Sequence, residues 1–140
     1  MKYLLDSNVL IEAIRRPESQ VGRRLNATPL EDLATSAVVA GELLVGPFRQ
    51  KSRSRESVLD ILSIFLAMEV LPFTLQCARI YGEIAALLVD QGTPIGDFDA
   101  QIAATALVHD LTVATHNTRH FHRVPGLRVE DWQTDVGPSP

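Results

Sequence analysis

The chain has 140 residues, of which 46% are hydrophobic and 21% are charged, and 17 acidic and 13 basic residues give a net charge of −4. This composition fits one globular domain with a substantial core and excludes a largely disordered protein. The longest apolar runs, such as 61–68, are too short to span a bilayer, which needs about 20 residues. We therefore expect a cytoplasmic protein without membrane contact, since neither the single Cys77 nor the start of the chain indicates secretion.

The first half of the chain alternates between strand and helix patterns. In chain order, the predicted elements are a strand at 2–5, a helix from 7 that ends before 17, a helix at 19–26, a strand at 33–35 and a helix at 37–46. Ser7 and Ser36 are suitable helix caps, because a hydroxyl group can accept a hydrogen bond from a free N–H of the first turn. Pro17 must end the first helix, and Gly46-Pro47 is expected to end the third.

The second half continues this alternation. In chain order, the predicted elements are a helix at 53–67, a strand at 69–73, a helix at 74–91, a helix at 97–110, a strand at 111–115 and a strand at 127–131. Strands that alternate with helices indicate a parallel sheet covered on both faces, an α/β protein built as a three-layer α/β/α sandwich. We expect a single domain over residues 1–133 and a flexible C-terminal tail over 134–140.

Asp6 is the only charged residue from Tyr3 to Ile11, and it directly follows the first predicted strand. In an open α/β sheet, functional groups collect just beyond the carboxyl ends of the strands. Asp6 is therefore a candidate site residue. The alternative is a structural role, since an acid beside Ser7 can also cap a helix and interact favourably with its dipole.

Glu42 is the only charged residue from Ser36 to Phe48, and it lies in the middle of an apolar helix. Burying an unpaired carboxylate is costly, so its charge needs compensation. One solution is a salt bridge to an arginine such as Arg15 or Arg79. The other is a cation that Glu42 shares with further carboxylates.

Two more acids begin the helix predicted at 97–110. Asp99 lies on the apolar stripe of this helix, which includes Ile102 and Ala106, so it should point toward the sheet. Asp97 is not on this stripe and need not point inward. Both positions also suit acids that stabilise the start of a helix.

Three carboxylates that converge without a cation would repel one another by about 4 kcal/mol per pair at about 4 Å in a surface-like dielectric. A set of oxygen ligands such as Asp6, Glu42 and Asp99 suits a hard divalent ion, Mg²⁺ or Mn²⁺, rather than zinc. Such an ion lowers the pKa of a bound water and neutralises charge that develops on a phosphate. These acids therefore indicate a metal site suited to phosphate chemistry.

The segment from 111 to 129 contains no acid and several basic residues. These are Arg119, Arg123, Arg128, His116, His120 and His122. The three histidines are an alternative zinc site, although no cysteine accompanies them. A second basic run at 49–55 is expected to be the exposed start of a helix.

Four blocks of the sequence resemble a known family. They are, in chain order, LLDSNVLI, VVAGELLVG, GTPIGDFDAQIAATAL and LTVATHNTRHFHRVPGLRVEDW. Their order and spacing are similar to those of the PIN-domain nucleases, especially the VapC toxins of bacterial toxin–antitoxin pairs, and the resemblance extends from Lys2 to Trp132. It implies a mainly parallel five-stranded sheet between helices, RNA cleavage with Mg²⁺ or Mn²⁺, a homodimer, and inhibition by a cognate VapB-type antitoxin.

The resemblance also implies roles for individual residues. Catalysis and metal binding are implied for Asp6, Glu42 and Asp99. The fourth block of the family often carries an acid two residues after its threonine, where this chain has Asn117 after Thr115. Closely similar toxins have a glutamate where this chain has His120. Asn117, His120 and Asp97 are therefore the alternatives for a fourth acidic position.

Two further groups of residues have expected supporting roles. Hydrogen bonds that orient the first acid or a metal-bound water are expected from Ser7, Asn8 and Thr115. Contacts to RNA phosphates are expected from Arg119, Arg123 and His120. The alternatives for this second group are exposure to solvent and docking of an acidic antitoxin tail.

The sequence thus favours a metal-dependent endoribonuclease toxin that hydrolyses RNA phosphodiester bonds, with tRNA as a candidate substrate and one or two ions as open alternatives. The alternative function is a catalytically weak PIN-like module that binds RNA or regulates another protein. This second interpretation rests on Asn117 and His120, which depart from the acidic pattern.

Overall fold

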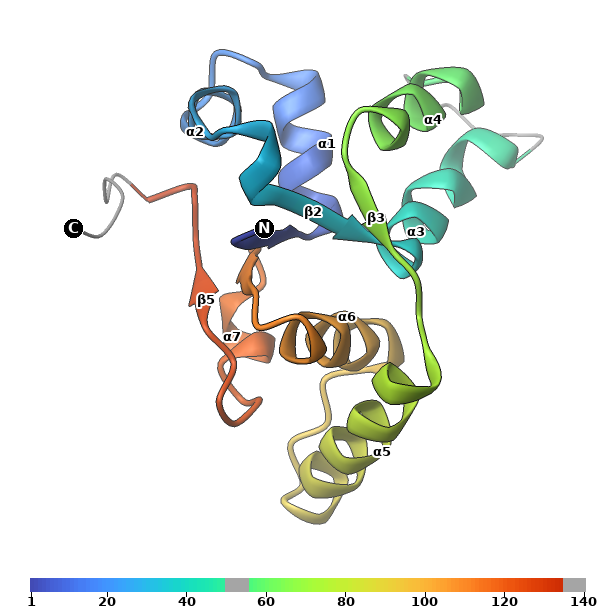
Figure 1. Cartoon of the computed structure of the whole chain (residues 1–140), viewed down its shortest axis with the longest axis vertical. Helices are drawn as coiled ribbons and strands as arrows, with labels where there is room; N and C mark the ends of the chain where they lie inside the picture. Colours follow the sequence, from blue (N-terminus) through green and yellow to red (C-terminus); the bar gives the residue numbers. More distant parts are fainter. Residues whose placement is uncertain (50–55, 135–140) are drawn as a thin grey trace.

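The computed structural model describes residues 1–49 and 56–134 of the chain (Figure 1). Within these residues, five parallel strands form one sheet in the order β3-β2-β1-β4-β5. The strands are β1 (Tyr3–Leu5), β2 (Leu33–Ser36), β3 (Glu69–Leu71), β4 (Thr112–Ala114) and β5 (Val129–Glu130). Because all five strands run in the same direction, their carboxyl ends meet at one edge of the sheet. The parallel sheet predicted from the sequence is confirmed.

Helices connect the strands and cover both faces of the sheet. They are α1 (Ser7–Arg15), α2 (Gln20–Ala27), the 3₁₀ helix η1 (Leu30–Asp32), α3 (Ala37–Phe48), α4 (Val58–Leu66), α5 (Leu75–Asp90), α6 (Asp97–Val108) and α7 (Thr118–Phe121). Figure 1 shows α1, α2 and α4 on one side of the sheet and α5, α6 and α7 on the other. This arrangement confirms the three-layer sandwich. None of the helices in the described residues is both long and apolar enough to cross a membrane.

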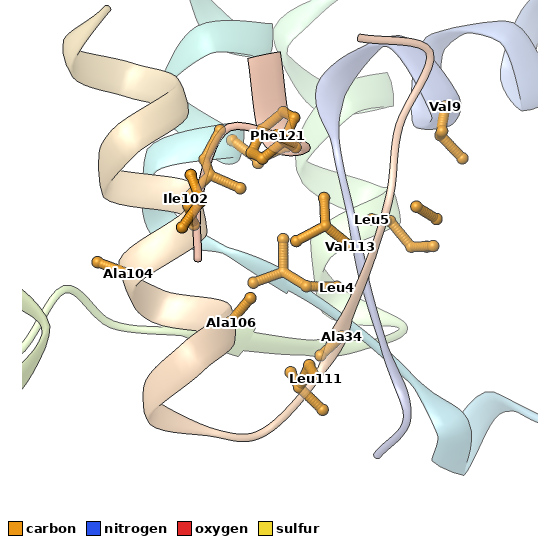
Figure 2. Close-up of a cluster of buried hydrophobic side chains, with 14 of the residues drawn as sticks. Leu4, Leu5, Val9, Ala34, Ile102, Ala104, Ala106, Leu111, Val113 and Phe121 are labelled. Carbon is orange, nitrogen blue, oxygen red and sulfur yellow. The ribbon is translucent and has the colours of Figure 1, made fainter. Parts of the chain in front are cut away.

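The core includes the central strand β1 and its two neighbours (Figure 2). Leu4 of β1 pairs in register with Ala34 of β2 on one side and with Val113 of β4 on the other, and all three residues are fully buried. Ile102 of α6 and Phe121 of α7 are fully buried in the same cluster. Burial of a large apolar side chain contributes about 1.5–3 kcal/mol to folding. The end of β1, where Asp6 follows, is therefore held in a well-packed part of the molecule.

Two helices begin directly where neighbouring strands end. Asp6 caps α1, because its side chain accepts a hydrogen bond from the backbone N–H of Ser7 at 2.8 Å. Ser36 caps α3 in the same way, accepting from the backbone N–H of Val39 at 3.1 Å. The cap of α1 is thus Asp6, which confirms the capping role predicted as its alternative, and not Ser7. Both helices leave the carboxyl edge of the sheet.

Several element boundaries differ from those predicted. Helix α3 continues through Pro47 to Phe48, because a proline near the end of a helix removes a single backbone hydrogen bond. Helix α6 ends at Val108 and not at 110, because Asp110 adopts a left-handed backbone conformation with φ of 55°. The short helices η1 and α7 were not predicted.

Two predictions concern residues outside the described ranges. The basic run at 49–55 falls largely on 50–55, and the tail at 134–140 falls largely on 135–140. The helix expected from 53 is seen as α4 from Val58. This start is set by a reciprocal cap, in which the backbone N–H of Ser57 donates to Asp60 Oδ2 at 2.9 Å and the backbone N–H of Asp60 donates to Ser57 Oγ at 3.1 Å.

Candidate active site at the carboxyl edge of the sheet

Asp6 is buried between β1 and β4, with 3% of its surface exposed. Its Oδ1 accepts the hydrogen bond from Ser7, and its Oδ2 accepts one from the hydroxyl group of Thr115 at 2.7 Å. Burial raises the pKa of Asp6, the hydrogen bonds from Thr115 and Ser7 oppose this increase, and the negative charge of Asp99 adds to it. The Asp6 carboxylate is thus fixed in place in an environment that does not favour its charge.

Glu42 projects from the second turn of α3 and is half-buried. Its Oε1 is inaccessible to solvent and has no hydrogen-bond partner in the described part of the chain. Burial raises the pKa of Glu42 to about 7, and the charges of Asp6 and Asp99 contribute to the increase. The carboxylate of Glu42 therefore lies near two other acids, and one of its oxygens has no partner among residues 1–49 and 56–134.

Neither of the two arginines named as possible partners pairs with Glu42 in the described residues. Arg15 instead binds Glu56 through two guanidinium nitrogens, each 3.1 Å from a carboxylate oxygen. Arg79 pairs with Glu83 one turn along α5, at 2.6 Å. Both arginines proposed as partners are thus bound to other acids.

Asp99 lies in the first turn of α6, where its Oδ2 meets two side chains from the segment that follows β4. The side-chain amide of Asn117 donates to this oxygen at 2.8 Å, and Nδ1 of His120 lies 3.0 Å from it. Asn117 and His120 also contact each other, with 2.9 Å between Nδ2 and Nδ1. The residues that depart from the family's acidic pattern are therefore both in direct contact with Asp99.

Asp97 begins the same helix but has a different neighbour. It is exposed, and its Oδ1 accepts a hydrogen bond from the hydroxyl group of Tyr81 on α5 at 3.2 Å. The charge of Asp99 raises the pKa values of Asp6 and Glu42, whereas Asp97 is not among the causes of either increase. Of the two acids, Asp99 is the one whose charge acts on the other carboxylates.

Asn8 and His116 form a second link between α1 and the end of β4. The side-chain oxygen of Asn8 accepts a hydrogen bond from the backbone N–H of His116 at 3.1 Å. The ring nitrogen Nε2 of His116 lies 3.0 Å from Oε2 of Glu12. The sequence interpretation did not include Glu12, although its position one helical turn after Asn8 places both residues on one face of α1.

The three histidines of the basic segment do not form a zinc site. His116 pairs with Glu12, His120 contacts Asp99, and His122 is exposed. Across residues 1–49 and 56–134, no group of three His, Cys, Asp or Glu side chains is arranged as a ready-made metal site. The three side chains therefore lie in different surroundings and do not converge.

The two arginines expected to contact RNA lie on α7 and in the segment that follows it. Arg119 on α7 is exposed. Arg123 is partly buried, and its guanidinium group donates to the backbone carbonyl of Pro94 at 3.1 Å. Arg123 thus links the loop before α6 to the segment after α7, while Arg119 is accessible to a ligand.

We call Asp6, Glu42 and Asp99 the acid site. The charges of Asp6 and Asp99 contribute to the raised pKa of Glu42, but the three acids are not gathered in a preformed coordination shell within the described residues. Their donor atoms are all carboxylate oxygens, which Mg²⁺ and Mn²⁺ prefer. The unpartnered Oε1 of Glu42 and the mutual repulsion of the acids both fit a divalent cation, which these three residues would hold.

Comparisons with known proteins point to one family. The PIN domain family model matches residues 3–127. The tRNA(fMet)-specific endonuclease VapC of Salmonella typhimurium is 35% identical over 133 residues, covering 94% of this chain and 98% of that protein. The toxin FitB of Neisseria gonorrhoeae is 38% identical over 136 residues, covering 92% and 97%. The crystal structure of DNA-bound VapBC from Salmonella typhimurium matches with a TM-score of 0.84 and 32% identity, covering 94% and 98%.

Proposed function

The chain belongs to the PIN-domain family, within its VapC group, and on this premise we propose that it is a metal-dependent endoribonuclease toxin of a toxin–antitoxin pair. The observation that carries the proposal is the buried Oε1 of Glu42, which has no hydrogen-bond partner in the described residues. Burial and the charges of Asp6 and Asp99 raise the pKa of this carboxyl group to about 7. Carboxylates that repel one another in the empty site are expected where a protein binds a cation, because the cation neutralises them.

The acid site has the parts that hydrolysis of a phosphodiester requires. A bound Mg²⁺ or Mn²⁺ would neutralise charge on the phosphate and lower the pKa of a water molecule. Hydrogen bonds from Ser7 and Thr115 orient Asp6 before a ligand binds, which favours a preorganised site. We propose in-line attack by water without a covalent enzyme intermediate, leaving the 5′-phosphate and 3′-hydroxyl ends that the family resemblance implies.

RNA binding is assigned to the segment that follows β4. Arg119 and His120 on α7 are partly or fully exposed beside the acid site, and Arg123 follows one turn later. Cationic side chains there would bind phosphates on both sides of the cleaved bond. Because these contacts would neutralise phosphates and release their counterions, RNA binding should weaken as the salt concentration rises.

We propose tRNA as the substrate class. The VapC of Salmonella typhimurium is named as a tRNA(fMet)-specific endonuclease, and this chain covers 98% of its length. Proteins that read RNA sequence mostly do so in single-stranded loops, whose bases are accessible. An unpaired loop of a tRNA is therefore the first site to examine for cleavage.

The proposed protein partners are a VapB-type antitoxin and a second copy of this chain. An apolar surface on α3 and α4 supports a protein partner, since exposed apolar patches mark interaction sites. Its exposed residues are Val45, Phe48, Leu59, Leu62 and Leu66. We assign this surface to the antitoxin, because the similar VapC of Salmonella typhimurium has been crystallised as a VapBC complex.

The test is cleavage of tRNA by the purified chain, free of antitoxin, with Mn²⁺ and with EDTA. We expect cleavage that requires Mn²⁺ and falls at least about 100-fold in Asp99→Asn, because a charged ligand is lost. Asp97→Asn is the matched control, since it makes the same chemical change in the same helical turn and should retain activity. Equal activity of the wild type and Asp99→Asn, or no cleavage by a folded wild type, would favour the RNA-binding or regulatory module.

A further inference from the structure

Asn117 and His120 surround one oxygen of Asp99. The distances among Asp99 Oδ2, Asn117 Nδ2 and His120 Nδ1 are 2.8, 2.9 and 3.0 Å, so the three atoms form a closed triangle. The Asp99 side chain is 18% exposed and that of His120 is 37% exposed. These contacts occupy Oδ2 of Asp99 and leave Oδ1 without a side-chain hydrogen bond among the described residues.

This triangle is tied to the rest of the acid site. The backbone N–H of Asn117 donates to Oγ1 of Thr115 at 2.9 Å, and the same hydroxyl group donates to Oδ2 of Asp6 at 2.7 Å. Two hydrogen bonds through Thr115 therefore connect Asp6 to Asn117, which binds Asp99 directly. The relative positions of two acids on different elements are thus set by one threonine and one asparagine.

His120 is also held in a defined place. It lies on α7, and its backbone N–H donates to the carbonyl of Asn117 at 3.2 Å. The next residue, Phe121, is completely buried and fixes this short helix on the core. Because its own backbone is fixed by these contacts, the His120 ring can act as a rigid support for Asp99.

The charges at the acid site limit how many cations it can hold. Asp6, Glu42 and Asp99 supply three negative charges. Asp97 is bound to Tyr81, and it does not contribute to the raised pKa of Glu42. Asn117 contributes a neutral amide. Two divalent ions would bring four positive charges to three carboxylates, of which Asp6 and Asp99 already have oxygens engaged in hydrogen bonds.

We propose that Asn117 and His120 are positioning residues that fix Asp99 for a single divalent ion, so that each chain binds one Mg²⁺ or Mn²⁺. This inference rests on the proposed metal site. It gives Asn117 and His120 a role at the fourth position, where the family usually has an acid. Asn117 and His120 do not add a fourth negative charge to the site. Instead, their side chains orient the carboxylate of Asp99. Support of this kind around a metal ligand typically changes metal affinity by about 10- to 100-fold.

The proposal is tested by titrating the antitoxin-free chain with Mn²⁺, following heat release and the loss of the free-ion electron paramagnetic resonance signal. We expect one ion per chain in the wild type. Asn117→Ala and His120→Phe should each weaken Mn²⁺ binding about 10-fold. His120→Gln should retain most of the affinity, because its amide can still donate to Asp99. Asn117→Asp adds a fourth charge and should allow a second ion to bind.

Asp97→Asn is the matched control and should bind Mn²⁺ as the wild type does. Thermal unfolding without metal checks that every variant is folded. Two ions on the wild-type chain would overturn the single-ion inference, and unchanged affinity in folded His120→Phe and Asn117→Ala would overturn the positioning role. Absence of RNA cleavage by a chain that binds one ion would contradict the proposed function and not this inference.

Discussion

The acids of this protein fall into two regions that differ in how their charge is compensated. At the carboxyl edge of the sheet, Glu42 has an oxygen without a partner in the described residues, and its pKa is raised to about 7. Elsewhere in the described residues, four acids each pair with an arginine. These pairs are Arg15–Glu56, Arg24–Glu130, Arg79–Glu83 and Arg128–Asp110.

The contrast is sharpest between the acid site and the surroundings of Glu130. There Arg24 lies 3.0 Å from Glu130 and stacks over the rings of Trp132 and Tyr3, with 4.8 and 5.7 Å between its guanidinium carbon and the ring centroids. Trp132 also donates to Glu130 at 3.2 Å. Charge near Glu130 contributes to stability, whereas charge at the acid site reduces it. Where a protein leaves negative charges without neighbouring positive charges, the reason is usually functional.

The largest expected effect comes from removing one charge from the acid site. Glu42→Gln keeps the shape of the side chain and removes the charge that would hold the metal ion. We expect the rate of RNA cleavage with Mn²⁺ to fall by about 100-fold or more. Glu83→Gln, which removes a charge from an exposed paired acid, is the control and should keep the wild-type rate. Similar initial rates for the two variants would remove the functional distinction between the regions.

The next effect concerns stability in the paired region. Arg24→Gln loses the ion pair and both ring contacts, so we expect the free energy of unfolding to fall by about 2 kcal/mol. Arg23→Gln on the same helix changes an exposed side chain and should alter it by less than about 0.5 kcal/mol. Urea unfolding measures both values. The affinity for Mn²⁺ should be the same in both variants, and a change in Arg24→Gln alone would mean that the regions are coupled.

A smaller effect of opposite sign is expected for Glu42→Gln without metal. The pKa of Glu42 is about 7 in the folded chain, above its ordinary value of 4.5, so the folded state binds the proton more tightly. The resulting stability is fully present below pH 4.5 and is lost as the pH rises through 7. After allowance for solvent screening, the free energy of unfolding of Glu42→Gln should exceed that of the wild type by about 1–2 kcal/mol at pH 8. The two values should be equal near pH 4.5.

Urea unfolding in EDTA at these two pH values checks this prediction. Saturating Mn²⁺ should remove the advantage of Glu42→Gln at pH 8, because the ion stabilises only a folded chain that can bind it. A wild type that is as stable as Glu42→Gln at pH 8 without metal would show that the charge of Glu42 is already compensated.

The smallest effect is expected at the exposed pair on α5. Arg79 and Glu83 lie one helical turn apart, and both side chains are more than 60% exposed. Arg79→Ala should change the free energy of unfolding by at most about 0.5 kcal/mol, and 1 M salt should remove most of that difference. A larger loss in thermal unfolding would mean that pairing alone does not explain the contrast between the regions.

The sequence was sufficient to predict the alternating fold, the position of Asp6 at a strand end and the position of Asp99 at the start of a helix. The position of Asp6 after a buried strand and the helical stripe of Asp99 are local patterns, and local patterns are readable without a structure. The partner of Arg15 was not predictable, because Glu56 is 41 residues away and is brought near only by the packing of the elements. The contact of Asn117 and His120 with Asp99 depends on α7, a four-residue helix that is too short to produce a periodic signal.

The most direct test of the account is a crystal structure of the chain with Mn²⁺, with anomalous diffraction measured to locate the ion. We predict one anomalous peak, within coordination distance of oxygens from Asp6, Glu42 and Asp99 in the same chain. A peak elsewhere, or well-ordered acids at saturating Mn²⁺ without a peak among them, would contradict the claim that these acids share a metal ion.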